Sequence, residues 1–183
     1  MASVLVPLAD GFEEIEAVSI IDVLRRGGVE VVTAYLNTKE VHGSNGITIL
    51  ANNSLDDVRS EDFDMMVLPG GIPGAEFLKN DQRVIKLIKE FNATNKNIAA
   101  ICAAPMALDI AGVLKGDYTC YPSYEEVIQS GNFRDDKKVV ESGNILTSRG
   151  PGTSICFALQ IVKKLSGVET YEALKSGLIA DFC

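Results

Sequence analysis

The chain has 183 residues, of which 46% are hydrophobic, so it can form one domain with a substantial core. Its 25 acidic residues outnumber 17 basic ones and give a net charge of −8, which argues against nucleic acid or an anionic membrane as the main partner. No apolar run reaches the roughly 18 residues of a membrane span, and residues 1–10 lack the basic segment of a signal peptide.

Short apolar runs alternate with segments of helical period, which is typical of a mostly parallel sheet with helices on both faces. Strands are expected, in chain order, over 3–8, 29–35, 65–68, 98–101, 117–122, 138–140 and 145–148. Helices are expected over 13–26, 81–93, 154–165 and 169–179. Residues 41–50 contain Gly-Ser-Asn-Gly between extended arms and predict a small hairpin excursion. The sequence therefore predicts one α/β sandwich over residues 1–183.

The four cysteines are scattered without a paired spacing, which favours the reducing cytoplasm over a disulfide framework. Cys156 lies on an apolar helical stretch and is expected in the core, whereas Cys183 is expected to be exposed or frayed. Cys120 and Tyr121 are neighbours on an extended segment, so their side chains should point to opposite faces. A single histidine argues against a histidine-built metal site, and we expect no metal and no other cofactor.

Residues 97–106 place a cysteine where a buried strand should end and a helix begin. Pro105 suits a first helical turn, because its missing N–H would be unsatisfied there anyway. A thiol at this junction faces unpaired N–H groups and the positive end of a helix dipole, and both lower its pKa. Cys102 is therefore a candidate nucleophile. The alternative is that it is simply a small, buried hydrophobic residue.

Three further loops should lie beside Cys102, because ligands of open α/β sheets bind beyond the carboxyl ends of the strands. These loops are residues 10–16, 69–71 and 150–152. The backbone N–H groups at Gly70 and Gly71, together with that of Ala103, could form an oxyanion site. An ordinary strand-ending turn is the alternative reading of the two glycines.

Glu13, Glu14 and Glu16 open the first helix, where acidic residues usually form a solvated face that complements the helix dipole. Glu16, however, lies between two apolar residues one turn into the helix, where its carboxyl group can point across the strand ends. Burial beside a thiolate would raise its pKa, so that it could stay protonated and act as a general acid. His42 is the only histidine available as a base, and we expect it on an exposed loop, distant in sequence from this site.

Four motifs resemble the ThiJ/PfpI superfamily, most closely its parkinsonism-associated protein deglycase branch. They are Leu8-Ala-Asp-Gly-Phe-Glu-Glu-Ile-Glu-Ala-Val18, Val67-Leu-Pro-Gly-Gly71, Ile98-Ala-Ala-Ile-Cys-Ala-Ala-Pro105 and Leu146-Thr-Ser-Arg-Gly-Pro-Gly-Thr153. The resemblance covers nearly the whole chain. It implies a flavodoxin-like three-layer sandwich and a homodimer packed through the first helix.

The resemblance also implies roles for individual residues. Cys102 would be the nucleophile at an elbow, and Glu16 would hydrogen-bond its thiol. Gly71 and Ala103 would supply oxyanion donors, while Arg26 would reach the site of the partner subunit. Relatives often place a histidine in a Thr-His-Pro sequence near the cysteine, where this chain has Cys120-Tyr121-Pro122. Tyr121 can donate or accept a hydrogen bond and is a candidate substrate-binding residue. Tyrosine is nevertheless a poor base at neutral pH, which weakens a Cys-His hydrolase or peptidase interpretation.

Two functions follow from the resemblance. The first is a glutathione-independent glyoxalase or protein deglycase, in which Cys102 attacks methylglyoxal-type dicarbonyls or their adducts and Glu16 moves the proton. The alternative is a cysteine-based redox sensor and stress-protective chaperone without significant turnover. A role in thiazole-phosphate biosynthesis is a historical label of the family. The sequence does not support it, because it contains no phosphate-binding loop of P-loop or Rossmann type.

Overall fold

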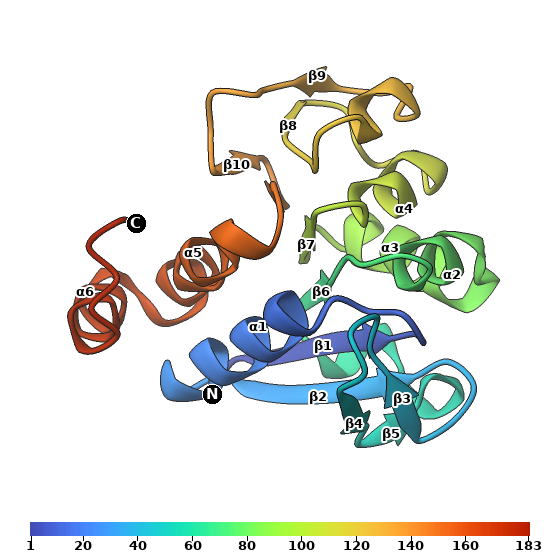
Figure 1. Ribbon diagram of the computed structural model, residues 1–183, viewed down its shortest axis with the longest axis horizontal. Coiled ribbons are helices and arrows are strands. Elements are labelled where there is room, and N and C mark those ends of the chain that lie inside the picture. The colour runs from blue at the N-terminus through green and yellow to red at the C-terminus, as the bar shows by residue number, and fades with distance from the viewer.

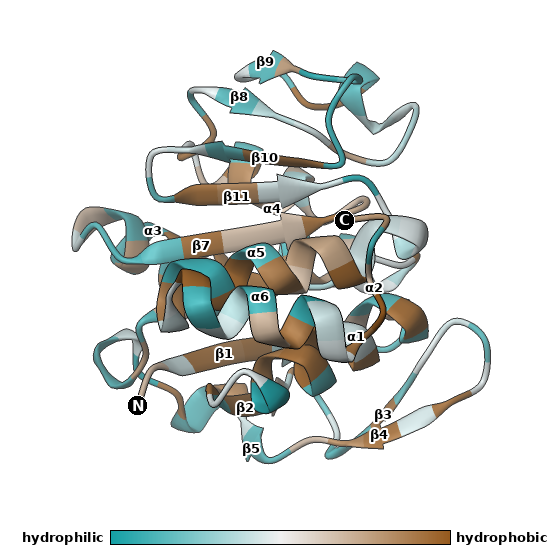
Figure 2. Ribbon diagram, turned by 90° about the vertical axis from the view of Figure 1, so that its left-hand side faces the viewer, coloured by the Kyte–Doolittle hydropathy of each residue, from teal (hydrophilic) through white to brown (hydrophobic).

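Seven strands form the central sheet of the computed structural model, which describes residues 1–183, in the order β10-β11-β7-β6-β1-β2-β5. Their bounds are β1 Ser3–Leu8, β2 Glu30–Tyr35, β5 Asn53–Ser54, β6 Met65–Leu68, β7 Asn97–Ile101, β10 Val139–Ser142 and β11 Ile145–Ser148. Every neighbouring pair is parallel except β10 and β11. The predicted mostly parallel sheet is confirmed, and Figure 2 shows its strands from β10 down to β5.

Helices cover both faces of this sheet (Figure 1). One face carries α1 Glu14–Arg26 and α5 Ser154–Ser166, with α6 Val168–Gly177 packed outside α5. The other carries α2 Gly74–Asn80, α3 Gln82–Ala93 and α4 Pro105–Ile110. Buried residues on α3 recur at helical spacing (Val84, Ile85, Leu87, Ile88 and Phe91), so one stripe faces the sheet. None of these helices combines the length and apolar character needed to cross a membrane.

Several short elements were not predicted from the sequence. The seven-residue helix α2 is one, and β5 at the sheet edge is another. The expected strand over 117–122 shrinks to β8 Asp117–Tyr118, which pairs with β9 Asn132–Phe133 outside the main sheet. Short 3-10 turns occupy Leu55–Asp57, Ser60–Asp62, Tyr124–Glu126 and Pro151–Thr153. Elements of two to seven residues carry too few periodic positions to stand out in a sequence.

The predicted hairpin is present, with β3 Glu40–His42 antiparallel to β4 Thr48–Leu50 (Figure 2, lower right). Its turn holds the Glu14 carboxylate, which accepts hydrogen bonds from Asn45 Nδ2 at 2.9 Å and Ser44 Oγ at 3.3 Å. Burial tends to raise the pKa of Glu14, but the hydrogen bonds from Asn45 outweigh it and lower the pKa. The expectation of a solvated face is therefore wrong for Glu14, because the hairpin covers it.

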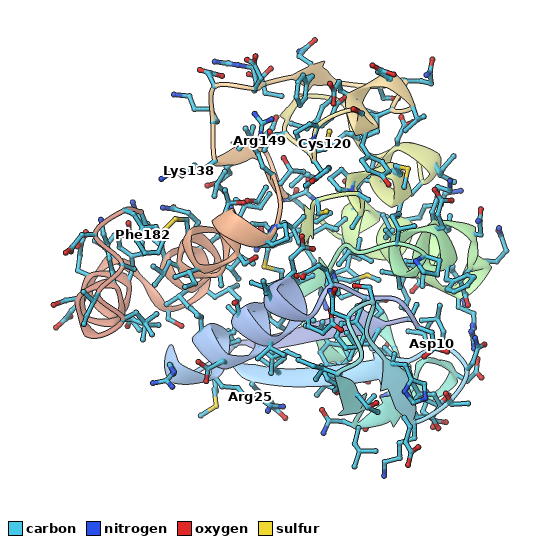
Figure 3. The ribbon with its side chains drawn as sticks, viewed as in Figure 1. Asp10, Arg25, Cys120, Lys138, Arg149 and Phe182 are labelled. Atoms are coloured by element: carbon cyan, nitrogen blue, oxygen red, sulfur yellow. A yellow bond between two sulfur atoms is a disulfide. The ribbon has the colours of Figure 1, made fainter.

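A disulfide joins Cys156 on α5 to Cys183, contrary to the expectation of unpaired cysteines. Cys156 is buried as predicted, but Cys183 is half-buried and bonded rather than exposed or frayed. The pair is 27 residues apart in sequence and meets because α6 packs back against α5. Nearby, Lys138 Nζ donates a hydrogen bond to the Phe182 carbonyl at 2.6 Å, and Figure 3 shows both residues beside α5. The two cysteines come together through tertiary packing, so their spacing in the sequence does not predict this disulfide.

The Cys183→Ser variant should be less stable than the parent protein by about 2–4 kcal/mol under non-reducing conditions, because a crosslink restricts the unfolded chain. Guanidinium denaturation with and without dithiothreitol measures this difference. With reductant, the two proteins should unfold at nearly the same denaturant concentration. Equal stability without reductant would contradict a stabilising disulfide.

Candidate active site

Cys102 lies in a sharp turn between β7 and α4. Its φ of +64° is in the left-handed region that residues other than glycine rarely adopt. The Cys102 N–H donates to the Ser148 carbonyl at 3.0 Å, and the Cys102 carbonyl accepts from the Tyr121 N–H at 2.9 Å. Pro105 opens α4, as predicted. Hydrogen bonds from two other segments thus hold this strained strand-to-helix turn in place.

The loops after β1 and β6 meet beside this turn, where the chain direction across the sheet reverses. The Glu13 N–H donates to the Gly70 carbonyl at 2.9 Å. A Cβ on Gly70 would lie 2.5 Å from Cys102 Cβ, and one on Gly71, whose φ is +93°, would lie 2.3 Å from the Glu13 nitrogen. No side chain fits at either glycine. The predicted convergence of these loops on Cys102 is therefore present in the fold.

Glu16 is fully buried in the first turn of α1. Its Oε2 accepts a hydrogen bond from the Gly70 N–H at 2.7 Å, whereas Oε1 has no hydrogen-bond partner. Burial raises the pKa of Glu16 to about 7, although the Gly70 N–H and the neighbouring Cys102 thiol act in the opposite direction, and the charge of Glu13 adds to the rise. The direction agrees with the expectation from the sequence. A carboxyl group with this pKa can gain and lose a proton near neutral pH.

The thiol of Cys102 departs from expectation, because its pKa is raised rather than lowered. Burial and the charge of Glu16 raise it to about 12, although the N–H groups of Gly71 and Ala103 act in the opposite direction. The helix that should have lowered it, α4, has only six residues, so its dipole is short. Cys102 is also only 8% exposed. Glu16 therefore loses its proton before the neighbouring thiol does, and its carboxylate is the group beside Cys102 that can accept the thiol proton.

His42 is exposed as expected, but it lies on β3 rather than in a loop. Its carbonyl accepts a hydrogen bond from the Gly11 N–H at 2.7 Å, so the hairpin is closer to the strand-end loops than its sequence position indicated. The imidazole Nδ1 lies 2.9 Å from Thr48 Oγ1 on the neighbouring strand. His42 is therefore engaged within the hairpin and is not paired with Cys102.

Arg26 lies at the opposite end of α1 from Glu16. Ten residues of helix separate the two, which is about 15 Å along the axis. The Arg26 guanidinium is exposed and pairs with Asp22 at 2.8 Å. Figure 3 labels the preceding residue, Arg25, at this end of the helix, far from Asp10 at the strand-end loops. Contact between Arg26 and the Cys102 site would therefore require a second subunit.

Tyr121 and Cys120 point to opposite sides, as their alternation predicts: Cys120 is fully buried, while Tyr121 is 46% exposed. A Cβ on Gly150 would lie 3.0 Å from Cδ2 of Tyr121 and 4.0 Å from Oε1 of Glu16, so Gly150 separates the tyrosine ring from the carboxyl group. Sequence reasoning missed Tyr124, whose ring lies edge-on to that of Tyr121 with centroids 6.4 Å apart. The Tyr-Pro-Ser-Tyr spacing across a turn was the available signal. No cluster of three or more His, Cys, Asp or Glu side chains is arranged to hold a metal.

Comparison with known proteins places this architecture in a wider group. Residues 2–164 match the model of the DJ-1/PfpI family. The Drosophila melanogaster protein dj-1beta is 42% identical over 183 residues, covering 98% of each chain. Its crystal structure superposes with a TM-score of 0.94 over 97% of each chain. A Caenorhabditis elegans relative named glutathione-independent glyoxalase DJR-1.2 is 36% identical, with 94% of this chain and 92% of that protein covered.

These matches extend over almost the whole length of the chain and include the β1–α1 segment, the glycine loop after β6 and the cysteine turn after β7. The fold agrees with the flavodoxin-like arrangement that the resemblance implied. The chain belongs to the DJ-1/PfpI family.

Proposed function

We propose that this protein is a glutathione-independent glyoxalase that converts methylglyoxal-type dicarbonyls to hydroxy acids. One observation carries the proposal: a buried Glu16 carboxyl group, with an unpartnered Oε1 and a pKa of about 7, lies beside the Cys102 thiol, whose pKa it raises. A thiol that attacks a carbonyl carbon must lose its proton, and the adjacent carbonyl must later receive one. Glu16 lies beside the thiol and can carry both of these protons.

In the first step the Cys102 sulfur bonds to the aldehyde carbon of methylglyoxal while Glu16 accepts the thiol proton. Glu16 returns this proton to the former aldehyde oxygen, which gives a hemithioacetal. The N–H groups of Gly71 and Ala103, which face the sulfur, supply the donors for the developing negative charge.

In the second step Glu16 takes the proton from the carbon bonded to sulfur and delivers it to the ketone oxygen, which gives an enediol. Glu16 then takes the hydroxyl proton from the carbon bonded to sulfur and delivers it to the neighbouring carbon, which produces a thioester of lactate. Water then cleaves the thioester to lactate and the free thiol. One methylglyoxal and one water are consumed for each lactate, so no external oxidant or reductant is needed.

The Caenorhabditis elegans relative, which is named a glutathione-independent glyoxalase, supports this proposal at the level of the family. A deglycase activity, which removes early dicarbonyl adducts from amines or thiols, would use the same sulfur–carbon bond in its first step. Lactate formation from free methylglyoxal measures the glyoxalase reaction alone.

A redox sensor is the second candidate, and it rests on the same pair. Oxidation of Cys102 to a sulfinate would place an anionic oxygen next to Glu16, and a protonated carboxyl group could donate to it. Such a protein would gain two oxygen atoms on Cys102 under mild peroxide and would show negligible turnover.

The deciding experiment is lactate formation from methylglyoxal in the absence of glutathione. Steady production of many lactate molecules per protein supports the glyoxalase. If no lactate appears while mass spectrometry finds two added oxygens on Cys102 alone, the redox-sensor reading replaces it.

We further propose that the chain forms a homodimer through α1. Ile15 and Val18 on this helix are 57% and 46% exposed, and Leu50 on β4 is 65% exposed. A shallow groove of about 350 Å³ runs between α1 and the hairpin, with Val18, Ile49 and Leu50 in its walls. Large exposed apolar side chains on adjacent elements are typical of a covered interface.

Sedimentation equilibrium should therefore give a mass near twice the 19.7 kDa of one chain. Replacement of Val18 by aspartate should shift it towards the monomer, because a charge would be buried in the interface. Replacement of the similarly exposed Val127, which lies outside the groove, should leave the mass unchanged. A monomeric parent protein would contradict the proposed interface.

A further inference from the structure

Two tyrosines, Tyr121 and Tyr124, form an aromatic pair next to the Cys102 turn, and we refer to them as the aromatic wall. The backbone holds them closely: the Tyr121 N–H donates to the Cys102 carbonyl at 2.9 Å, and the Tyr124 N–H donates to the Tyr121 carbonyl at 3.1 Å. Ser123 between them has a φ of +78°, which turns the chain sharply enough to bring the two rings together. Their planes meet at 69° in an edge-on arrangement.

The first ring lies near the reacting groups. A Cβ atom on Gly150 would lie 3.0 Å from Cδ2 of Tyr121 and 4.0 Å from Oε1 of Glu16, so the tyrosine ring and this oxygen both lie next to Gly150. That oxygen is buried and has no hydrogen-bond partner in the protein. An unpartnered carboxyl oxygen that shares the neighbour Gly150 with an aromatic ring points to the place where substrate atoms would sit.

The second ring extends this surface. Tyr124 is half-buried, and its pKa is raised by burial and then by the nearby charges of Cys102, Glu76 and Tyr121. Its ring packs partly against the hydrophobic core and lies edge-on to that of Tyr121. Tyr121 is 46% exposed, so part of its ring remains available to a ligand beside Tyr124.

From this arrangement we infer that the aromatic wall binds the substituent on the ketone carbon of the substrate and favours planar, apolar groups, so that aryl 2-oxoaldehydes are better substrates than methylglyoxal. The inference rests on the proposed glyoxalase function. Aromatic rings bind one another edge-on or offset with an added contribution beyond burial, whereas a methyl group covers little of either tyrosine. Phenylglyoxal and one water would give mandelate, with the same proton movements as for methylglyoxal.

The test is the ratio of kcat/KM for phenylglyoxal to kcat/KM for methylglyoxal. We expect a ratio of about ten in the parent protein, because one aromatic contact contributes about that factor. In Tyr121→Ala the ratio should fall to about one, and in Tyr121→Phe it should be retained, since the ring remains. Phe182→Ala removes a similarly exposed aromatic ring, which lies beside α5 (Figure 3), and should leave the ratio unchanged.

An unchanged ratio in Tyr121→Ala would overturn the inference. Loss of turnover on both substrates in Tyr121→Phe would also overturn it, because the hydroxyl group rather than the ring would then be responsible.

A second measurement does not depend on turnover. Alkylation of Cys102 by N-benzyliodoacetamide should be faster, relative to iodoacetamide, in the parent protein than in Tyr121→Ala by about tenfold. If no dicarbonyl is turned over but this difference is observed, the proposed function fails and the aromatic wall stands. If lactate is formed but neither ratio responds to Tyr121→Ala, the proposed function stands and the aromatic wall fails.

Discussion

Replacing Cys102 by serine is expected to reduce lactate formation from methylglyoxal by at least about 10³-fold. The hydroxyl group of serine is far less acidic than a thiol, and Glu16, with a pKa of about 7, is too weak a base to activate it. The proposed oxyanion donors, the N–H groups of Gly71 and Ala103, would remain. Any residual rate would therefore measure the catalysis that the site provides without its nucleophile. Lactate produced per protein molecule, measured at substrate saturation, provides the comparison.

The control for this experiment is His42→Ala. His42 is exposed and its ring contacts Thr48 on β4, so its loss should leave turnover within about twofold of the parent. Circular dichroism should show both variants folded. Substantial turnover in Cys102→Ser, or its loss in a folded His42→Ala, would contradict the assignment of the site.

The Glu16→Gln variant should have opposite effects on activity and on stability. Activity should fall by about 10²–10⁴-fold, because glutamine can still accept the Gly70 N–H but cannot carry a proton between sulfur, oxygen and carbon. In the parent protein kcat/KM should rise with pH through about 7, as Glu16 loses its proton and becomes able to accept the thiol proton. The variant should lack this rise. A parent-like rate and pH profile in Glu16→Gln would remove Glu16 from the mechanism.

Stability should change in the other direction. The pKa of Glu16 is about 7 in the folded protein, against an ordinary value of 4.5, so the folded state binds more protons than the unfolded state between these two values. The free energy of unfolding of the parent therefore declines as the pH rises through this interval, by an amount on the order of 3 kcal/mol. Glutamine does not titrate, so the variant escapes this decline.

Urea denaturation at pH 4, 6 and 8 should consequently show the stability of Glu16→Gln increasing relative to the parent as the pH rises. Glu61→Gln, at an exposed glutamate, should follow the parent at all three pH values. A constant difference between Glu16→Gln and the parent would mean that folding does not raise the pKa of Glu16. Retention of a destabilising carboxyl group is typical of functional sites, where stability and activity compete.

Much of the fold could be predicted from the sequence, because the strands and longer helices carry strong local signals. The strands at 3–8, 65–68 and 145–148 agree with β1, β6 and β11 to the residue. The turn at Cys102 was also predictable, since Pro105 and the small residues before it allow few other backbone paths. The glycines after β6 were recognised as part of the same site for a related reason. A strand-ending Gly-Gly pair exposes backbone N–H groups wherever the strand ends.

The remaining features depend on contacts between distant segments. The disulfide between Cys156 and Cys183 requires α6 to return along α5, and the burial of Glu14 requires the hairpin turn to close over it. The raised pKa of Cys102 likewise reflects burial and a negative neighbour from another helix, whereas the sequence indicated only the favourable helix end. Tyr124 lies beside Tyr121 because of a turn between them, and the residue types in this turn do not predict its direction.

The sequence by itself therefore determined the alternation of strands and helices, the position of the cysteine turn and the residues that could do chemistry there. Only the tertiary structure decided which groups are buried together, which protonation states follow and which surfaces face the thiol. The physical reason is the range of the forces involved. Backbone conformation is governed by steric contacts between near neighbours in the chain, whereas pKa values and crosslinks depend on distances in space and on the exclusion of water.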